Sequence, residues 1–465
     1  MRPRNRAARD RLNAELLRNA PVSAAILAER LQVSVPTILR ILKENQQHVV
    51  RIGTTKNARY ALRRTLRGTT HTFPVYRIDE HGKGHECSSL ELVHPHGSVM
   101  DLNQMGWPVD SEHLNGYWDG LPYPLYDMRP QGFLGRHFAK QTHHDLGLPT
   151  HLGDWSDDDI VFALAQRGSD TSGNLIIGDP AYERWLKDIA NQTAPLAQDK
   201  QAEHYADMAD HAMSTGIPAS SAAGEFPKFT ASRELAGAAT PHVIVKFSGA
   251  DNSSAVRRWS DLLVAEHIAL NTLAEINRLP VAKSRILNAR GRTFIEVERF
   301  DRIGALGRSE VVTLASIDGA FLGSAESDWP TLIQRLINAK LCNPQAFNQT
   351  RLLWWFGKLI ANSDMHMGNL SFRFSPQTNT LPELHLAPAY DMLPMQYAPL
   401  AGGEIPVQQF EPNLPLPKDR DIWATACVAA LEFWQQASND SRISENFRKI
   451  CLDNFQQLEK LAQLV

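Results

Sequence analysis

The chain has 465 residues, a mass of 52.0 kDa and a formal net charge of −3, with 43% hydrophobic and 21% charged residues. This length allows about three domains of about 150 residues each, and the hydrophobic content excludes a wholly disordered chain. No apolar run reaches the about 18 residues of a membrane span, and the first residues lack the apolar stretch of a secretory signal. The four cysteines are widely separated, which argues against a disulfide framework. We therefore expect a cytoplasmic protein that does not bind membranes.

Residues 1–67 are strongly basic, whereas the rest of the chain is acidic. The basic segment holds 15 Lys and Arg against 4 Asp and Glu, a net charge of +11, so the remainder carries −14. Concentrated positive charge attracts nucleic-acid backbones by displacing their counterions, whereas an acidic body is repelled by them. We therefore expect any nucleic acid to bind at the N-terminal segment, which would make the protein nucleoid-associated.

Apolar spacing in this segment predicts three helices followed by two strands. The expected helices are Arg9–Asn19, Val22–Leu31 and Val35–Gln46, and the expected strands are His48–Ile52 and Arg59–Leu62. Ser23 and Ser34 are suited to cap the second and third helices, and Pro36 falls in a first turn, where its missing N–H is not needed. The side chains expected to be buried are Leu12, Leu16, Leu17, Ile38, Leu39, Ile41 and Leu42.

This order of elements resembles a winged helix-turn-helix domain, in which the third helix enters the major groove of double-stranded DNA and the hairpin contacts phosphate. The candidate DNA contacts are the outward-facing residues of these two elements: Thr37, Arg40, Lys43, Lys56 and Arg59. The alternative is a winged helix that docks on protein and whose charges are only a solvated face. The coincidence of the basic excess with the third helix and the hairpin favours DNA.

Residues 68–216 are less informative. The predicted segments are two short strands and one loop rich in Gly, Pro and aromatic residues: Thr72–Ile78, Ser88–Val93 and Trp107–Arg129. Trp118, Tyr123 and Tyr126 are candidates for a pocket wall, but such residues are more often core, and core is favoured.

A helix or linker is predicted at Thr193–Gly216. This stretch contains His204, Asp207, Asp210 and His211, the residue types of a metal cluster, but the sequence implies no ligand geometry. A solvated helix is therefore the favoured interpretation.

Residues suited to nucleotide chemistry follow this linker. Ser220–Phe229 begins with small residues that permit close backbone approach to a phosphate, although it is not a Walker A loop and a surface turn is the alternative. His242–Phe247 is predicted to be a strand that carries Lys246, whose ammonium needs a carboxylate or phosphate partner in an apolar setting. Glu266, on the following helix, is the candidate partner. A strand lysine paired with a helix glutamate holds the phosphates of ATP in protein kinases; two surface residues are the alternative.

Two further carboxylates and an amide have the spacing of a kinase catalytic centre. Asp364 and Asn369 match the D-x-x-x-x-N pattern, in which the Asp orients or deprotonates the attacking hydroxyl and the Asn binds Mg²⁺. Asp391 follows a predicted short strand, 22 residues after Asn369, where kinases carry the metal-binding Asp of D-F-G. Met392 and Leu393 replace the Phe and Gly of that motif, which excludes an ordinary eukaryotic kinase.

These segments resemble the HipA-like serine/threonine kinase toxins of bacterial toxin–antitoxin systems. The resemblance covers about residue 218 to the C-terminus and, more loosely, the region from residue 68. Its strongest segments are Asn362–Ser371, with a D-x-H-x-x-N pattern, and Ala387–Leu393, with a P-x-Y-D pattern. Supporting matches are Ala223–Lys228, Lys246, Glu266, Leu279–Val281 and Val297–Arg302.

The resemblance implies transfer of the γ-phosphate of ATP to Ser or Thr of a protein, such as a translation factor or an aminoacyl-tRNA synthetase, with Mg²⁺ as the metal. The roles that it implies are phosphate-side loop for Ala223, Gly224 and Lys228; phosphate binding for Lys246 with Glu266; adenine contact for Glu298 and Phe300; catalysis for Asp364 with His366 beside the nucleotide; and Mg²⁺ ligation for Asn369 and Asp391. Ser221 matches a serine that such kinases autophosphorylate, and a loop hydroxyl without a role is the alternative.

The sequence also departs from the family in two ways. Phe226 stands where several members have Gln, which puts the detailed phosphate contacts in doubt. HipA-like toxins commonly rely on a separate DNA-binding antitoxin, whereas this chain carries its own basic module. Whether an antitoxin protein is a partner is therefore left open.

These expectations together describe an α+β chain: a winged helix-turn-helix followed by a two-lobed, kinase-like body with a mostly helical C-terminal lobe. The expected segments are the DNA-binding module at 1–67, a connecting subdomain at 68–216, a nucleotide-binding lobe at 217–327 and a helical catalytic lobe at 328–465. Two alternatives belong to other classes. One is a Mg²⁺-dependent nuclease acting on DNA, and the other is a non-catalytic transcription regulator that senses a nucleotide.

Overall fold

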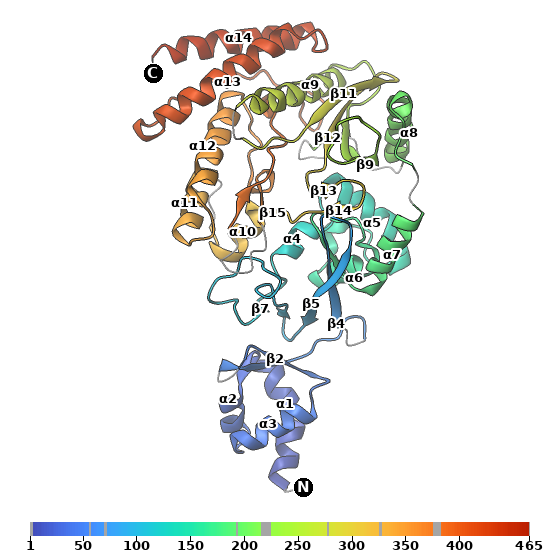
Figure 1. Cartoon of the computed structure of the whole chain (residues 1–465), viewed down its shortest axis with the longest axis vertical. Helices are drawn as coiled ribbons and strands as arrows, with labels where there is room; N and C mark the ends of the chain where they lie inside the picture. The colour runs from blue at the N-terminus through green and yellow to red at the C-terminus, as the bar shows by residue number, and fades with distance from the viewer. Residues whose placement is uncertain are drawn as a thin grey trace.

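The computed structural model describes residues 3–54, 57–68, 72–191, 194–214, 225–276, 279–324, 328–374 and 383–464. Figure 1 shows an N-terminal module at one end of the long axis, then a middle region, then a body of two lobes. Helices and strands are mixed throughout, as expected for an α+β chain. Among the described helices, none is long and apolar enough to cross a membrane.

The N-terminal module contains three helices and a three-stranded antiparallel sheet with the order β1-β3-β2. Its elements are α1 (Pro3–Asn19), β1 (Val22–Ser23), α2 (Ala24–Arg30), α3 (Val35–Glu44), β2 (Val49–Ile52) and β3 (Arg59–Leu62). Ser23 caps α2 by accepting a hydrogen bond from the backbone N–H of Ile26, as predicted. The predicted second helix is wrong at its start, because Val22 and Ser23 pair with β3 instead.

Two residues predicted to be buried in this module are exposed. Leu17 and Leu39 keep 44% of their surface accessible, whereas Leu12, Leu16, Ile38, Ile41 and Leu42 are buried as expected. Each of the two adjoins a buried position in sequence, and the apolar core is too narrow to cover both neighbours on a helix. Leu39 therefore adds an apolar group to the outward face of α3.

The module docks directly on the middle region. The backbone N–H of Arg64 donates to the carbonyl of Leu92 at 2.8 Å, and the N–H of His94 donates to the carbonyl of Leu62 at 2.9 Å. An apolar cluster crosses the same junction: Val50, Ile52, Ala61 and Val93. Ion pairs Arg63–Glu91 and Arg64–Asp158 flank it. The joint is therefore a packed contact.

The middle region is a five-stranded sheet, β7-β6-β5-β4-β8, with helices beside it. The strands are β4 (Thr72–Ile78), β5 (Gly84–Leu92), β6 (Ser98–Val99), β7 (Tyr117–Trp118) and β8 (Leu175–Ile177). The helices are α4 (Pro124–Met128), α5 (Gly132–Leu146), α6 (Asp157–Arg167) and α7 (Asp179–Ala190), and α8 (Gln201–Ser214) follows them and packs on the next sheet. The first strand matches its predicted bounds, and the aromatic loop contains a short strand and a short helix.

The sheet lobe follows, with a four-stranded antiparallel sheet of order β11-β12-β10-β9 and one long helix packed on it. The elements are β9 (Lys228–Ser232), β10 (His242–Phe247), α9 (Ser254–Ala274), β11 (Ser284–Ala289) and β12 (Arg292–Glu298). Val243, Val245 and Phe247 of β10 join an apolar cluster with Tyr205 of α8. Because side chains alternate along a strand, Ile244 and Lys246 lie on the other face of the sheet.

The helical lobe completes the body. Its helices are α10 (Leu314–Phe321), α11 (Trp329–Asn338), α12 (Pro344–Leu359), α13 (Arg420–Asn439) and α14 (Glu445–Ala462). In Figure 1, α13 and α14 lie on one side of α9, and α10 to α12 lie on the other. Two short sheets accompany them: β13 (Arg302–Ile303) with β14 (Gly307–Arg308), and β15 (Val312–Thr313) with β16 (Ser371–Arg373) and β17 (His385–Leu386). Trp354 and Trp355 are half-buried against this core.

Candidate active site

Lys246 of β10 is the centre of a buried ion triad. Its ammonium donates to both carboxylate oxygens of Glu266 on α9, at 2.7 and 2.8 Å, and to Oδ1 of Asp391. Lys246 is 5% exposed and Glu266 is fully buried. The expectation that this ammonium needs a carboxylate is therefore met twice, and the second carboxylate comes from 145 residues away.

The triad holds Lys246 in its charged form. Burial alone would lower the pKa of the ammonium, but the carboxylates of Asp391 and Glu266 outweigh burial and raise that pKa above its ordinary value. Burial also opposes ionisation of Asp391, yet the charge of Lys246 lowers its pKa. Burial raises the pKa of Glu266, and the charge of Lys246 opposes this rise.

The catalytic-loop candidates lie on a turn after α12. The backbone N–H of Asp364 donates to Oδ1 of Asn362 at 3.1 Å, and the amide nitrogen of Asn369 donates to the carbonyl of Asp364 at 2.8 Å. The 3-10 turn η4 (Met367–Asn369) is capped by His366, whose Nδ1 accepts from the N–H of Gly368. Since the nitrogen of Asn369 shapes the loop, its amide oxygen is the atom suited to ligate a metal.

The carboxyl group of Asp364 titrates above its ordinary range. Partial burial raises its pKa, the positive charge of His366 opposes this, and the charge of Asp391 adds to it. A carboxylate that binds a proton more tightly is better suited to accept one from a hydroxyl group.

Asp391 has unusual backbone geometry and a rigid neighbour. Its φ of +54° is in the left-handed region, which residues other than Gly adopt rarely and which is found preferentially at functional sites. The adjacent Tyr390 donates its hydroxyl to the carbonyl of Gly368 at 2.7 Å and lies 2.8 Å from Oγ of Ser371. Tyr390 therefore ties the segment of Asp391 to the loop of Asp364 and Asn369.

Glu225, the first described residue after the small-residue run, binds the middle region. Its carboxylate accepts from the backbone N–H of Phe133 in the first turn of α5 at 2.9 Å and from Arg136 at 3.2 Å, and it pairs with Lys228 at 2.9 Å. Gly132 has a φ of +61°, and a Cβ atom there would lie 2.5 Å from Oε1 of Glu225. Sequence reasoning did not find this anchor, because its partners come from a different domain.

A cavity of about 1300 Å³ brings most of these groups together. Among the predicted site residues, those that line it are Lys228, Asp364, His366, Asn369 and Asp391. The opposite wall comes from the middle region and includes Trp118, Tyr123 and Tyr126. Trp118 and Tyr123 are also buried in the main core, so the core and pocket interpretations both apply to them.

Two residues expected near adenine lie outside the lining of this cavity. The backbone N–H of Glu298 donates to the carbonyl of Lys283 at 2.9 Å, and its carboxylate pairs with Arg233 at 3.0 Å. Phe300 packs on Tyr390, with ring centroids 5.5 Å apart. The adenine contact stays a prediction. Phe226 packs edge-on against Trp259.

The segment around Phe300 has a second role that the sequence did not reveal. Arg299 and Arg302 both bind Asp170 of the middle region, at 2.9 and 2.6 Å. Asp301 accepts from both arginines and from the backbone N–H of Gly173 at 3.1 Å. This network joins the sheet lobe to the middle region: Arg299, Asp301 and Arg302 are buried, and Asp170 lies at its solvent-exposed edge.

The chemistry of the donor set fits Mg²⁺ near Asn369 and Asp391. Both offer hard oxygen ligands, and Mg²⁺ is usually held by one or two protein groups together with phosphate oxygens. No cluster of three or more His, Cys, Asp or Glu suited to a metal occurs in the described part of the chain. The acidic residues of α8 are instead ion-paired: Asp207 with Arg290 and Asp210 with Arg292. This favours the solvated-helix interpretation of α8.

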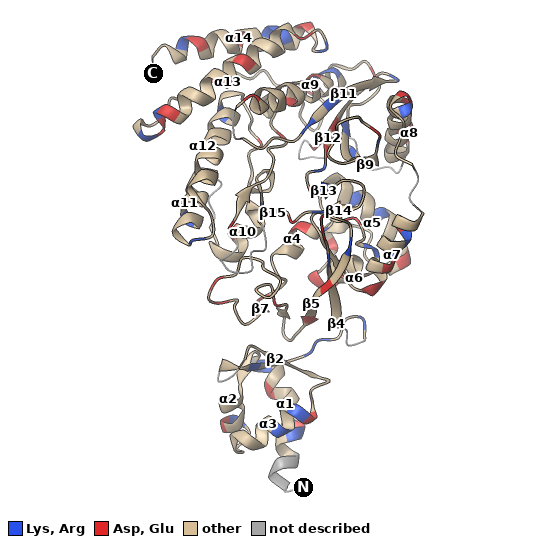
Figure 2. Ribbon diagram, viewed as in Figure 1, with Lys and Arg blue, Asp and Glu red and all other residues tan. Residues whose placement is uncertain are grey.

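Several predicted residues fall elsewhere. Lys56, Ser221, Ala223 and Gly224 lie outside the described residues. In the N-terminal module, Arg40, Lys43 and Arg59 are exposed and Thr37 is half-buried, with its hydroxyl 2.9 Å from that of Ser34. Figure 2 shows basic residues gathered on α1 and α3, at the end of the molecule opposite α13 and α14.

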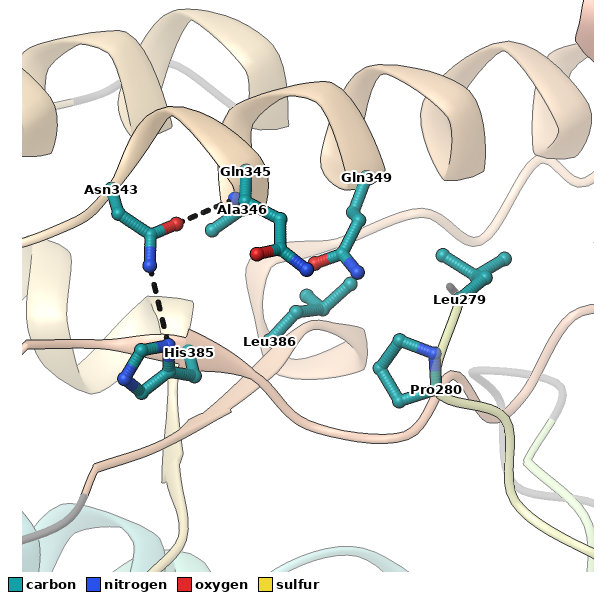
Figure 3. A pocket seen from close by; sticks show the side chains of 8 residues that line it. All are labelled: Leu279, Pro280, Asn343, Gln345, Ala346, Gln349, His385 and Leu386. Carbon is teal, nitrogen blue, oxygen red and sulfur yellow. Dashed lines mark hydrogen bonds between the residues drawn. The ribbon is translucent and has the colours of Figure 1, made fainter. Parts of the chain in front are cut away.

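A second cavity, of about 390 Å³, lies beside the start of α12 (Figure 3). Asn343 caps α12 by accepting from the N–H of Ala346, and its amide nitrogen lies 3.2 Å from Nδ1 of His385. The predicted site residues in the described ranges do not line it, and we assign no chemistry to it.

Comparison with known proteins shows which families the chain resembles. Residues 69–186 match the family described as YjjJ-like toxin, middle domain, and residues 220–458 match the HipA-like C-terminal domain, which covers more than half of the chain. Toxin YjjJ of Escherichia coli (strain K12) is 36% identical over 451 residues, covering 97% of this chain and 98% of that protein.

Two solved structures are also similar. The first is HipA in the complex of HipA, HipB and operator DNA from Shewanella oneidensis MR-1, with 15% identity, a TM-score of 0.49, and coverage of 84% of this chain and 97% of that one. The second is the Helicobacter pylori proinflammatory kinase CtkA, with 13% identity, a TM-score of 0.32, and coverage of 50% and 87%. The domain matches and the identity over nearly the whole length show that the chain belongs to the HipA-like toxin family.

Proposed function

We propose that the chain is a toxin kinase that transfers the γ-phosphate of ATP to a Ser or Thr hydroxyl of a protein. The observation that carries this proposal is the ion triad: Lys246 binds Glu266 and Asp391 beside the cavity that Asp364 and Asn369 line. In protein kinases the same residue types hold the phosphates and the metal.

Each residue has a distinct task in the proposed reaction. The ammonium of Lys246, kept charged by its two carboxylates, binds phosphate oxygens of ATP. Asp364 orients the acceptor hydroxyl and accepts its proton as the oxygen attacks the γ-phosphorus, and ADP leaves with the bonding electrons. When bound to Asn369 and Asp391, Mg²⁺ supplies positive charge that neutralises the phosphate oxygens. Most of the rate enhancement then comes from positioning and charge.

The N-terminal module supports a second part of the proposal, which is binding of double-stranded DNA. Arg40 is 56% exposed on α3, Lys43 is exposed one turn further along, and Arg59 is exposed on β3. The arrangement of three helices and a hairpin with this charge is suited to a winged helix-turn-helix reading the major groove. An antitoxin would then be needed for inhibition of the kinase and not for access to DNA.

The test is transfer of radiolabelled γ-phosphate to a protein acceptor, or to the chain itself, by the purified full-length protein, followed by phosphosite mapping. Asp364→Asn and Asp391→Asn should abolish transfer, and Ser363→Ala, an exposed neighbour, should not. DNA cleavage that requires Mg²⁺ but not ATP would support a nuclease instead. Stabilisation by Mg²⁺-ATP without turnover would support a nucleotide-sensing regulator.

A further inference from the structure

A carboxylate of the middle region lies in the wall of the catalytic cavity and caps a helix of the other lobe. Asp127, on α4, accepts hydrogen bonds from the backbone N–H of Thr313 at 2.7 Å and from its hydroxyl at 2.6 Å. Its Oδ1 also accepts from the hydroxyl of Ser316 at 2.8 Å. Thr313 is the N-cap of α10, so Asp127 completes the cap from another part of the chain.

The capped segment is hydrogen-bonded directly to the end of the catalytic loop. Thr313 pairs with Ser371 in the β15–β16 ladder, and the backbone N–H of Leu314 donates to the carbonyl of Leu370 at 2.8 Å. Leu370 follows Asn369 in the sequence. A shift of Thr313 would therefore be passed to the metal-ligand candidate through one pair of backbone contacts.

Aromatic packing reinforces the same junction. Tyr123, one residue before α4, contacts Phe321 of α10 with ring centroids 5.2 Å apart, and Trp107 contacts Phe374, just after β16, at 4.5 Å. The middle region thus contacts α10, which precedes the catalytic loop in sequence, and the residue just after β16, which follows it. Burial raises the pKa of Asp127, while the three donors oppose this, which is the pattern of a carboxylate held for its hydrogen bonds.

We propose that Asp127 is a positioning residue: acting through Thr313 and the β15–β16 pair, it holds the loop that carries Asp364 and Asn369 in its productive geometry. In this proposal the middle region helps to position the catalytic residues of the kinase body. The kinetic consequence rests on the proposed kinase function, whereas the structural consequence does not.

The chain offers a matched control for this proposal. Asp159, in the first turn of α6, makes a local version of this cap: its carboxylate accepts from the backbone N–H of Ser156 at 3.0 Å and from its hydroxyl at 2.7 Å, and it also pairs with Arg67 at 3.2 Å. Asp159 does not line the cavity. Asp127→Asn and Asp159→Asn therefore remove comparable caps, and only the first should affect the catalytic loop.

The experiment compares full-length wild-type protein with Asp127→Asn, Asp159→Asn, Thr313→Val and Thr313→Ser. Because a small misplacement of reacting groups is costly, Asp127→Asn should lower kcat about 100-fold while the KM for ATP changes less than about threefold. Thr313→Val, which removes the hydroxyl that donates to Asp127 and accepts from the N–H of Ser316, should lower kcat about tenfold. Thr313→Ser keeps that hydroxyl and should retain the wild-type kcat. Asp159→Asn should leave kcat unchanged.

Hydrogen–deuterium exchange of residues 364–372, without nucleotide, gives a readout independent of activity. Exchange there should be faster in Asp127→Asn than in wild type and unchanged in Asp159→Asn. Unchanged exchange in Asp127→Asn, or an equal decrease of kcat in the two Asp variants, overturns the positioning role. If the wild type transfers no phosphate, the proposed function fails, and the exchange data alone decide whether Asp127 holds the loop.

Discussion

The ammonium of Lys246 lies 2.7 Å from Oε1 and 2.8 Å from Oε2 of Glu266, so a strand residue and a helix residue form a bidentate ion pair at a fully buried carboxylate. Such a pair is costly to form and more costly to break, because removing one partner leaves the other charge buried and uncompensated.

Lys246→Met should therefore affect both stability and activity. We expect the free energy of unfolding to fall by about 3–5 kcal/mol, because Glu266 is deprived of its counter-charge. Phosphate transfer should be abolished. Urea denaturation and the γ-phosphate assay measure the two effects. In the double variant Lys246→Met/Glu266→Gln, stability should largely recover while activity does not. A decrease of stability in the double variant equal to that in the single variant would show that packing, and not charge, is responsible.

Asp364→Asn should separate activity from stability. Removing a general base lowers kcat by about 10²–10⁴-fold. Burial raises the pKa of Asp364, so the fold disfavours its ionised form, and this cost is present at any pH above that raised pKa. A neutral Asn avoids the cost, and the melting temperature at pH 7 should be equal to or higher than that of the wild type. A melting temperature several degrees lower would contradict the assignment. Differential scanning calorimetry measures it.

The pH dependence of stability should report on Asp301. Burial would raise its pKa, but the guanidiniums of Arg299 and Arg302 outweigh burial and hold that pKa well below its ordinary value. A lowered pKa stabilises the fold above the ordinary value, and this stability is lost as the pH falls below about 4. Asp301→Asn should lower the free energy of unfolding by about 3–5 kcal/mol at pH 7.

The difference between wild type and Asp301→Asn should shrink as the pH falls from about 4 toward 2, because the Asp301 carboxyl group of the unfolded wild-type chain binds a proton there while that of the folded chain stays ionised. Urea titrations at several pH values measure this. Asp440→Asn gives a comparison at a smaller ion pair: hydrogen bonds from Arg442 also lower the pKa of Asp440, so its difference from wild type should change with pH in the same direction. A difference that does not change with pH would mean that the ion network contributes no linked stability.

DNA binding should depend on the outward face of α3. Arg40→Ala/Lys43→Ala should weaken binding to all duplex sequences, and the slope of log K against log salt should fall by about 0.9 for each phosphate that the variant no longer neutralises. Fluorescence anisotropy at several salt concentrations measures both quantities. The control, Lys449→Ala/Lys460→Ala on α14, removes the same charge at the far end of the molecule. An equal weakening in the two variants would indicate a non-specific charge effect.

Sequence reasoning succeeded where one local rule determined the result. The strand His242–Phe247 has its predicted bounds, because apolar β-branched residues there have no helical spacing. The pairing of Lys246 with Glu266 followed from the energetic cost of an unpaired buried ammonium. The short spacing between Asp364 and Asn369 also placed both on one turn.

Contacts between distant segments could not be predicted in this way. Nothing in the sequence indicates that Asp127 caps α10 or that Glu225 binds the first turn of α5, since each contact depends on how two separately folded regions pack. The exposure of Leu39 has a similar origin. Helical periodicity identified an apolar residue next to the core stripe, but only the width of the packed interface decides on which side it lies.

If the N-terminal module binds DNA as proposed, its packed joint with the middle region would set the orientation of the duplex relative to the body. Two backbone hydrogen bonds and an apolar cluster hold the module on the middle region, so the body would keep a fixed orientation relative to bound DNA. If two copies bound neighbouring sites on one duplex, the number of base pairs between the sites would set the direction in which each cavity faces. Inserting five base pairs would rotate one copy by about half a turn relative to the other.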